Sequence, residues 1–186
     1  MALFPPLSIA WLNGWIPLVL FYGIFFILLK IFPKETVSRL YDRSHWTSEQ
    51  ARTAKIGLPF GLAAIALIVF TSLKIGQPVF WIGLIFYIAG FAGFVYSLHT
   101  YNITPLGKPA TRGLYKFSRN PQWVSFAVTF LGIIFMMGSW TMFVLLLIRV
   151  ITNHFRLIGE EGALEIQYGE SYLDYKKSVP RYFGFF

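Results

Sequence analysis

The fold is decided by residues 121–148, which read PQWVSFAVTFLGIIFMMGSWTMFVLLLI and contain no charged side chain. A transmembrane helix needs about 20 apolar residues, so this run of 28 residues is too long for one perpendicular helix and rather short for two. Gly138 and Ser139 stand near its middle and are typical of a tight turn. We therefore predict a helical hairpin whose second helix continues past Arg149 into water.

The composition of the whole chain is that of a membrane protein. Of 186 residues, 56% are hydrophobic and only 13% are charged, and the mean hydropathy is +0.60. These values exclude a water-soluble globule, a disordered tail and a solvated binding module. The absence of cysteine excludes disulfides and thiolate metal sites. The net charge of +8 indicates an anionic membrane face as partner and no nucleic acid, because there is too little polar surface for a nucleic-acid groove.

Three further long apolar segments precede the hairpin. With it they predict an all-α integral membrane protein in which residues 1–186 form a single domain with five transmembrane helices and a tail. The expected spans lie at about residues 13–32, 56–73, 77–98, 121–137 and 140–155, and the tail is 156–186. Gly57, Pro59 and Gly61 should kink the start of the second span.

The basic residues predict the orientation of these spans. Fifteen of the 16 lysines and arginines fall in residues 30–55, 99–121 and 149–186, and Lys74 alone lies in another loop. Because basic segments stay in the cytoplasm, we expect the N-terminus outside and the C-terminus in the cytoplasm. The two polar segments that flank the hairpin should then lie close together.

One helical face in the second of these segments carries candidate chemistry. Arg149, Asn153, Arg156 and Glu160 are spaced by 4, 3 and 4 residues, which places them on one side of a helix. An ionisable side chain at the membrane edge is costly and is a functional candidate; the alternative for Arg149 is an arginine that snorkels to the headgroups. We predict catalytic roles for Arg149 and Arg156 and a substrate contact for Asn153.

The residues that follow allow two interpretations each. Glu160 and Glu161 are a candidate receptor for ammonium or ribose hydroxyl groups, or else a solvated acidic face. Tyr168, Tyr172, Tyr175 and Val179 repeat the helical spacing. This stripe is typical of an amphipathic helix lying on the headgroups, which we favour over the alternative of contact with a cofactor.

Simpler structural interpretations account for several other motifs. Asn120-Pro121 predicts the N-cap and first residue of a helix, and Gly90 and Gly93 favour close helix packing. The histidines lack carboxylate or cysteine companions at metal-ligand spacings, so we predict no metal site. They are His45, His99 and His154.

Taken together, the motifs of the C-terminal half resemble a known family. They are Gly113-Leu114-Tyr115, Arg119-Asn120-Pro121-Gln122-Trp123, Arg156 with Glu160-Glu161, and the run from Tyr168 to Arg181. Their order and spacing, over about the last 85 residues, resemble the isoprenylcysteine carboxyl methyltransferase and phospholipid methyltransferase superfamily of integral membrane enzymes.

The resemblance implies methyl transfer from S-adenosylmethionine, held between the last hairpin and the cytoplasmic tail, to a lipophilic acceptor that arrives from the bilayer. The acceptor classes left open are a prenylcysteine carboxylate, a phospholipid amine and a small hydrophobic thiol or amine. The residues that would bind the cofactor by similarity are Tyr115, Arg119, Asn120, Pro121, Glu160 and Glu161. Trp123, where tyrosine is usual, keeps an aromatic face and is assigned to the substrate.

Two other functions compete with this one. Membrane sterol and steroid reductases share a similar C-terminal helical arrangement but bind NADPH, and a non-catalytic scaffold or small transporter would bind no cofactor. The adjacent Glu160 and Glu161 favour the methyltransferase, because a 2′-phosphate would call for more arginine and fewer carboxylates.

Overall fold

The computed structural model describes residues 1–44 and 46–184, apart from the side chains of residues 50, 53 and 54. Within these ranges every regular element is helical and no strand forms, so the predicted all-α fold is confirmed. The α-helices are α1 (Trp15–Ile31), α2 (Lys34–Tyr41), α3 (Ser48–Ile56), α4 (Leu58–Val69), α5 (Pro78–Asn102), α6 (Pro121–Met137), α7 (Trp140–Tyr168) and α8 (Glu170–Ser178). A 3₁₀-helix, η1 (Gly113–Lys116), precedes α6.

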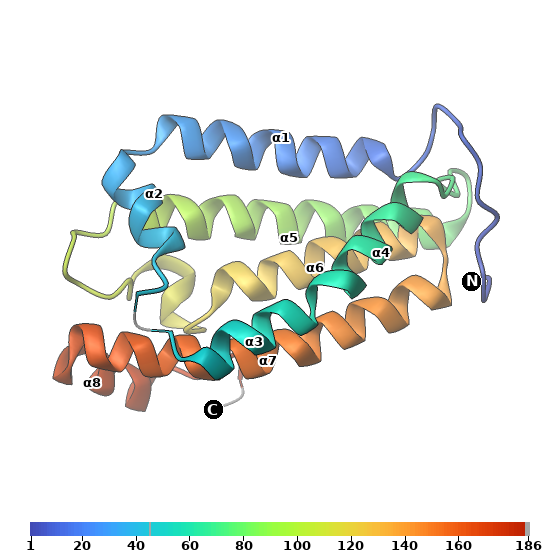
Figure 1. The fold of residues 1–186 in the computed structure, drawn as a ribbon. Helices are drawn as coiled ribbons and strands as arrows, with labels where there is room; N and C mark the ends of the chain where they lie inside the picture. The colour runs from blue at the N-terminus through green and yellow to red at the C-terminus, as the bar shows by residue number, and fades with distance from the viewer. Residues whose placement is uncertain (45, 185–186) are drawn as a thin grey trace.

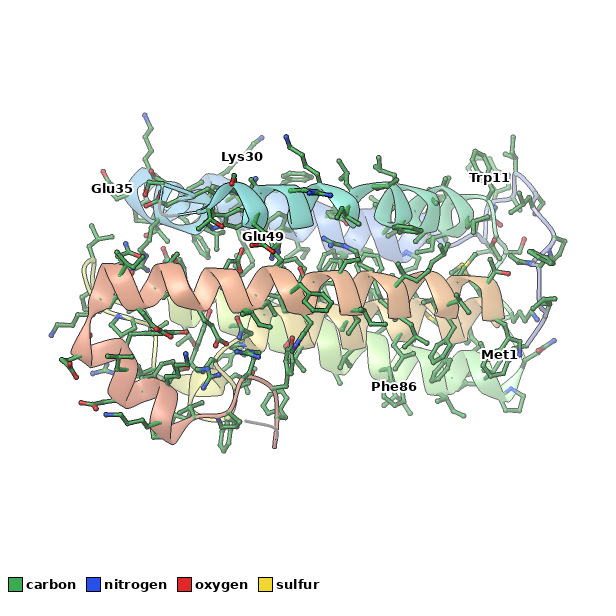
Figure 2. The ribbon with its side chains drawn as sticks, turned by 60° about the horizontal axis from the view of Figure 1, so that its bottom comes forward. Met1, Trp11, Lys30, Glu35, Glu49 and Phe86 are labelled. Carbon is green, nitrogen blue, oxygen red and sulfur yellow. The ribbon has the colours of Figure 1, made fainter. Side chains whose placement is uncertain are left out.

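The longer helices run along a common axis and give the molecule two different ends (Figure 1). The N-terminal segment closes one end, and α2, η1 and α8 gather at the other, which we call the polar end. Figure 2 shows Met1 and Trp11 at the first end and Lys30 and Glu35 toward the polar end.

Apolar helices make up most of the bundle. Among the residues that the structure describes, α5 with 25 residues and α7 with 29 are long and apolar enough to cross a membrane. The helices α1, α4 and α6 are apolar but shorter. The helix α4 has 12 residues and is shorter than the expected span at 56–73, because the chain breaks at Gly57 and turns after Val69. The break at Gly57 confirms the expected kink.

The connection between α6 and α7 is the predicted hairpin. Gly138 follows α6 with a φ of 63°, a left-handed conformation that favours glycine. Ser139 then caps α7 by accepting a hydrogen bond from the backbone N–H of Met142. The helix α7 continues past Arg149 as far as Tyr168, so the predicted turn and the continuous second helix are confirmed. That the end of α7 lies in water stays a prediction.

Close packing of α5 against α6 aligns the helices that lead to the polar end. A Cβ on Gly90 would lie 2.4 Å from the backbone nitrogen of Thr129, and one on Gly93 would lie 2.7 Å from the hydroxyl of Ser125. The absence of side chains at these positions therefore allows the two helices to approach closely, which confirms the packing role predicted for this glycine pair.

The chain reverses after α7 and packs back on the bundle. Gly169, with a φ of 55°, separates α7 from α8. Tyr172, Tyr175 and Val179 then turn inward and form a buried cluster with Tyr115. The prediction that this tyrosine stripe lies on the headgroups is therefore wrong. The positive φ at Gly169 ends α7 and starts a new helix, whose apolar face packs on η1.

Candidate active site

A cavity of about 500 Å³ opens at the polar end. This volume lies within the range of about 300 to 1,000 Å³ found for ligand pockets. Its wall combines aromatic rings from α1, α5, α6 and α8 with ionisable side chains from other elements. The basic residues are Arg39, Arg43, Lys108, Arg119, Arg149 and Arg156, and the acidic residues are Asp42 and Glu160. We call this space the main cavity.

Most of the residues predicted from the sequence meet in this wall. Those that line the main cavity are Tyr115, Arg119, Asn120, Pro121, Trp123, Arg149, Arg156 and Glu160. Asn153 and Glu161 stand behind the wall, where they are 5% and 2% exposed. The adjacent pair Glu160 and Glu161 is thus divided, because neighbouring residues on a helix point about 100° apart.

Arg156 is held in one position by four neighbours. Its guanidinium lies 4.2 Å from the ring centroid of Trp123 and 5.8 Å from that of Trp46, within reach of cation–π attraction. Its Nε donates to Oδ1 of Asn153 over 2.9 Å, and its Nη1 lies 3.3 Å from Oε1 of Glu160. Asn153 therefore contacts the arginine rather than the cavity, and its place in the structure is that of a positioning residue.

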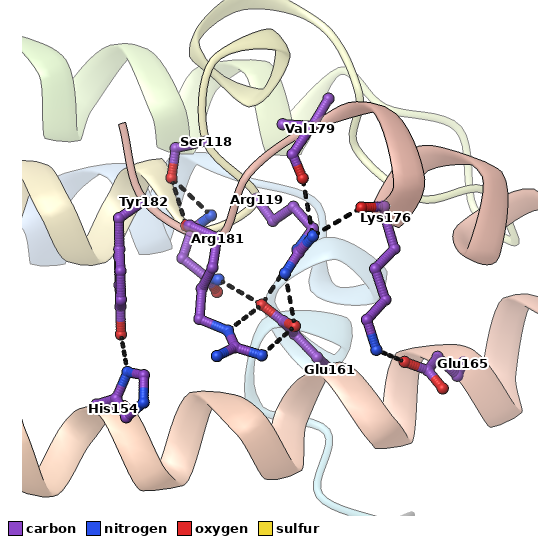
Figure 3. Close-up of polar contacts among 10 residues, drawn as sticks. Ser118, Arg119, His154, Glu161, Glu165, Lys176, Val179, Arg181 and Tyr182 are labelled. Carbon is purple, nitrogen blue, oxygen red and sulfur yellow. Dashed lines mark hydrogen bonds and ion pairs between the residues drawn. The ribbon is translucent and has the colours of Figure 1, made fainter. Parts of the chain in front are cut away.

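Glu161 forms the centre of a buried ionic clamp (Figure 3). Arg119 reaches its two carboxylate oxygens over 3.2 and 3.1 Å, and Arg181 reaches them over 3.0 Å each. Asn120 donates a further hydrogen bond from Nδ2 over 3.1 Å. The hydrogen bonds with Glu161 raise the pKa of Arg181 above its usual value.

The clamp changes the interpretation of two sequence motifs. Asn120 occupies the N-cap position of α6, as predicted, but its side chain makes no cap hydrogen bond because it is directed to Glu161. Arg119 also donates from Nη1 to the carbonyls of Lys176 and Val179, each over 2.8 Å. Every nitrogen of this guanidinium is therefore engaged: Nε and Nη2 bind Glu161 on α7, and Nη1 binds the carbonyls at the end of α8.

Tyr115 forms part of the floor of the main cavity. Its hydroxyl accepts a hydrogen bond from Nε2 of Gln122 over 2.8 Å, and its backbone carbonyl accepts one from the hydroxyl of Tyr175 over 2.7 Å. Burial raises the pKa of Tyr115 well above its ordinary value. The phenol therefore stays neutral at physiological pH and acts as a hydrogen-bonding group, not as a base.

Sequence reasoning missed the contribution of α2 and the segment after it. Arg39 donates to the carbonyls of Tyr101, Thr104 and Pro105 at the end of α5 and lies 4.2 Å from the Tyr101 ring centroid. The contacts draw α2 over the cavity and bring Trp46 to Arg156. The signal in the sequence is the mixture of arginines and aromatic residues in this segment, which by itself predicts only the side of the membrane.

Histidine does not contribute to the main cavity wall as the structure describes it. In residues 1–44 and 46–184 no group of three or more histidine, aspartate or glutamate side chains could hold a metal ion. His45, one of the three histidines for which no metal site is predicted, lies outside the described residues.

The fold and the site define a class: a helical membrane protein with a ligand cavity at the polar end of its bundle. Comparison with known families makes this specific. Residues 60–171, more than half of the chain, match the family model described as phospholipid methyltransferase. The chain belongs to this family, which confirms the resemblance to the membrane methyltransferase superfamily. No curated protein and no solved structure matches the chain.

Proposed function

We propose that the protein transfers a methyl group from S-adenosylmethionine to a lipophilic acceptor at the face of the membrane. Membership of the phospholipid methyltransferase family supports this, as do the apolar helices that lead to the cavity. The observation that carries the proposal is the meeting of separate family motifs in one wall. There Asn120, the N-cap of α6, and Trp123 of α6 line the same cavity as Arg156 and Glu160 of α7.

The residues of the main cavity fit the proposed cofactor. Glu160 presents a carboxylate that is able to accept hydrogen bonds from an ammonium group or ribose hydroxyls, and Arg156 is able to bind a carboxylate. Tyr101, Tyr168 and Tyr172 add aromatic faces for a purine. When bound, the cofactor supplies a methyl group on a sulfonium that is open to in-line displacement.

The chain's own residues have the task of positioning. Such a displacement depends mainly on holding the acceptor behind the methyl group, and a carboxylate acceptor needs no base. Arg156 is already fixed by Asn153, Glu160 and two tryptophans, so it loses little conformational freedom when it binds a ligand. Arg149 differs from Arg156 in its position, because it lies on the side of the main cavity that adjoins the apolar helices.

The charge of the cavity wall favours one competing function. Six basic side chains against two acidic ones would also suit the phosphates of NADPH, the cofactor of the reductase alternative. The family match favours the methyltransferase. Titration calorimetry of the purified protein in detergent, with S-adenosylhomocysteine and with NADPH, separates the two. We expect binding heat with S-adenosylhomocysteine alone, and heat with NADPH alone would refute the proposal.

We further propose five spans with the N-terminus outside and the polar end in the cytoplasm. The distribution of basic residues supports this, because 15 of 16 fall in segments that share one side in a five-span topology. The chain contains no cysteine, so a single introduced cysteine reports its own side. Ser44→Cys and Ser178→Cys should both react with an impermeant thiol reagent from the cytoplasmic side, and reaction from opposite sides would exclude the five-span topology.

A further inference from the structure

A second, smaller cavity adjoins the main one and extends away from the polar end. Its volume is about 180 Å³ and it lies between α4, α6 and α7. Apart from Arg149 and the hydroxyl of Tyr22, its wall is apolar, with Ile65 from α4, Phe130 from α6 and Met142 from α7 among its lining residues. We call it the apolar cavity.

The two cavities meet at three residues. Tyr22, Phe126 and Arg149 line both cavities, so these side chains form the boundary at which the two cavities meet. At the far edge, Leu58 and Leu62 line the apolar cavity and are each 58% exposed on the surface of the bundle. This edge of the apolar cavity therefore borders the lipid that surrounds an integral membrane protein.

Arg149 is the cation at this junction, and none of the described side chains supplies it with an anion. Its guanidinium lies 5.7 Å from the ring centroid of Trp123, but the described part of the chain gives it no side-chain hydrogen bond and no ion pair. The neighbouring cavity cations differ, since Arg119 is paired with Glu161 and Arg156 with Glu160. A guanidinium at membrane depth is costly without a partner, which points to an anion supplied by a ligand.

The backbone of α4 makes room for this guanidinium. Gly57 and Gly61 face it, and a Cβ on Gly57 would lie 2.8 Å from Nη1 of Arg149. A Cβ on Gly61 would lie 3.7 Å from Nε, which is ordinary van der Waals contact. Gly57, at the break between α3 and α4, thus leaves the space that Arg149 occupies, while Gly61 tolerates a side chain that would narrow the apolar cavity.

We propose that Arg149 and the apolar cavity bind the acceptor, as an amphiphile with an anionic group on the guanidinium and a single apolar chain in the cavity. This inference rests on the proposed function. The anion is a phosphate or a carboxylate close to the chain, and the part of the molecule to be methylated extends into the main cavity. The small volume of the apolar cavity limits it to one chain, so any second chain stays in the bilayer.

Photolabelling tests this site without any turnover. The probe is dodecyl phosphate with a diazirine at the end of its chain, used with the protein in a neutral maltoside detergent. Dodecanoate and dodecyltrimethylammonium with the same diazirine are the companion probes. We expect the anionic probes to label the walls of the apolar cavity around Ile65 and Met142. The cationic probe should label these residues no more than the background level.

The two anionic probes also identify the source of the anion. Stronger labelling by the phosphate supports a lipid phosphate, and stronger labelling by the carboxylate supports a lipid-linked carboxylic acid. Equal labelling by the cationic probe, or labelling confined to the outward-facing residues Val144 and Leu147, would overturn the proposal.

Two variants with matched controls sharpen the test. Arg149→Gln should lower the affinity for the anionic probes by about 10- to 100-fold, as for a lost charged hydrogen bond, whereas Arg52→Gln, on an exposed part of α3, should not. Gly61→Leu should block labelling by filling the apolar cavity, whereas Gly23→Leu should not, because no atom lies within 4 Å of a Cβ there.

Binding of S-adenosylhomocysteine separates failure of this inference from failure of the proposed function. Both variants should keep the wild-type affinity for S-adenosylhomocysteine, which also shows that they fold, while methyl transfer to chain-bearing acceptors falls. If Gly61→Leu blocks labelling but leaves methyl transfer intact, the apolar cavity does not hold the acceptor and the inference is wrong. If the wild type binds no S-adenosylhomocysteine, the proposed function fails whatever the labelling shows.

Discussion

Glu160 and Glu161 are neighbours on α7, yet they belong to two different regions of the molecule. Glu161 is 2% exposed and receives hydrogen bonds from Arg119, Asn120 and Arg181. Glu160 lines the main cavity, and its side chain is 27% exposed beside Arg156. A run of two acidic residues therefore does not define one site. The carboxylate that is saturated by its own protein stabilises the fold, and the one that is left partly open is available to a ligand.

The largest expected effect is on stability, at the buried carboxylate. Glu161→Gln leaves Arg119 and Arg181 without their counter-ion, and breaking a buried ion pair costs about 3 to 5 kcal/mol. Thermal unfolding of the detergent-solubilised protein should show this loss. The control is Glu165→Gln, which removes the partly exposed pair with Lys176 and should cost no more than about 1 kcal/mol. Similar unfolding of the two variants would show that the clamp does not hold the tail.

The next effect falls on ligand binding, at the open carboxylate. Glu160→Gln keeps the size of the side chain and removes its charge, so the affinity for S-adenosylhomocysteine should fall by about 1.5 to 3 kcal/mol. The unfolding temperature should change much less than in Glu161→Gln. Calorimetric titration measures the first quantity, and an unchanged affinity would exclude Glu160 from the cofactor site.

A third effect depends on pH, and it arises in the buried region that the clamp closes. Burial raises the pKa of Tyr115, Tyr172 and Tyr175 above their ordinary value near 10. Below about pH 10 these phenols are neutral in both folded and unfolded chains, and their contribution to stability is fully present. Above it the unfolded chain ionises first, so the free energy of unfolding should fall by up to about 1.4 kcal/mol per pH unit for each tyrosine.

Unfolding followed from about pH 8 to about pH 11 measures this dependence. Tyr172→Phe should flatten the alkaline loss, because phenylalanine cannot ionise. Tyr41→Phe, at an exposed position on α2, should leave it unchanged. An identical slope in all three proteins would mean that the tyrosine cluster is open to solvent.

Local sequence patterns predicted the helical frame well. Gly138 and Ser139 carry the turn signal in a short segment, so the hairpin could be placed without knowledge of the rest of the chain. The break at Gly57 was predictable for the same reason. Spacing along α7 also brought Arg149, Arg156 and Glu160 to one face, and all three line the main cavity.

Contacts between distant segments could not be predicted in this way. Arg39 reaches carbonyls at the end of α5, more than 60 residues away, and this contact places Trp46 beside Arg156. Glu161 is buried and paired while Glu160 lines the cavity, and this difference depends on where the segment after α8 places Arg181. The tyrosine stripe was misassigned because its period indicates only that one face is apolar, and does not say whether lipid or protein covers it.

The most direct test of the central claim is transfer of a tritiated methyl group from S-adenosylmethionine into lipid. The wild-type protein, reconstituted with a total membrane lipid extract, is incubated with the labelled compound, and the organic phase is counted. We predict labelled product in the organic phase, a strong reduction for Glu160→Gln and near wild-type levels for Glu165→Gln. Absence of label from the organic phase with wild-type protein that binds S-adenosylhomocysteine would contradict a lipophilic acceptor.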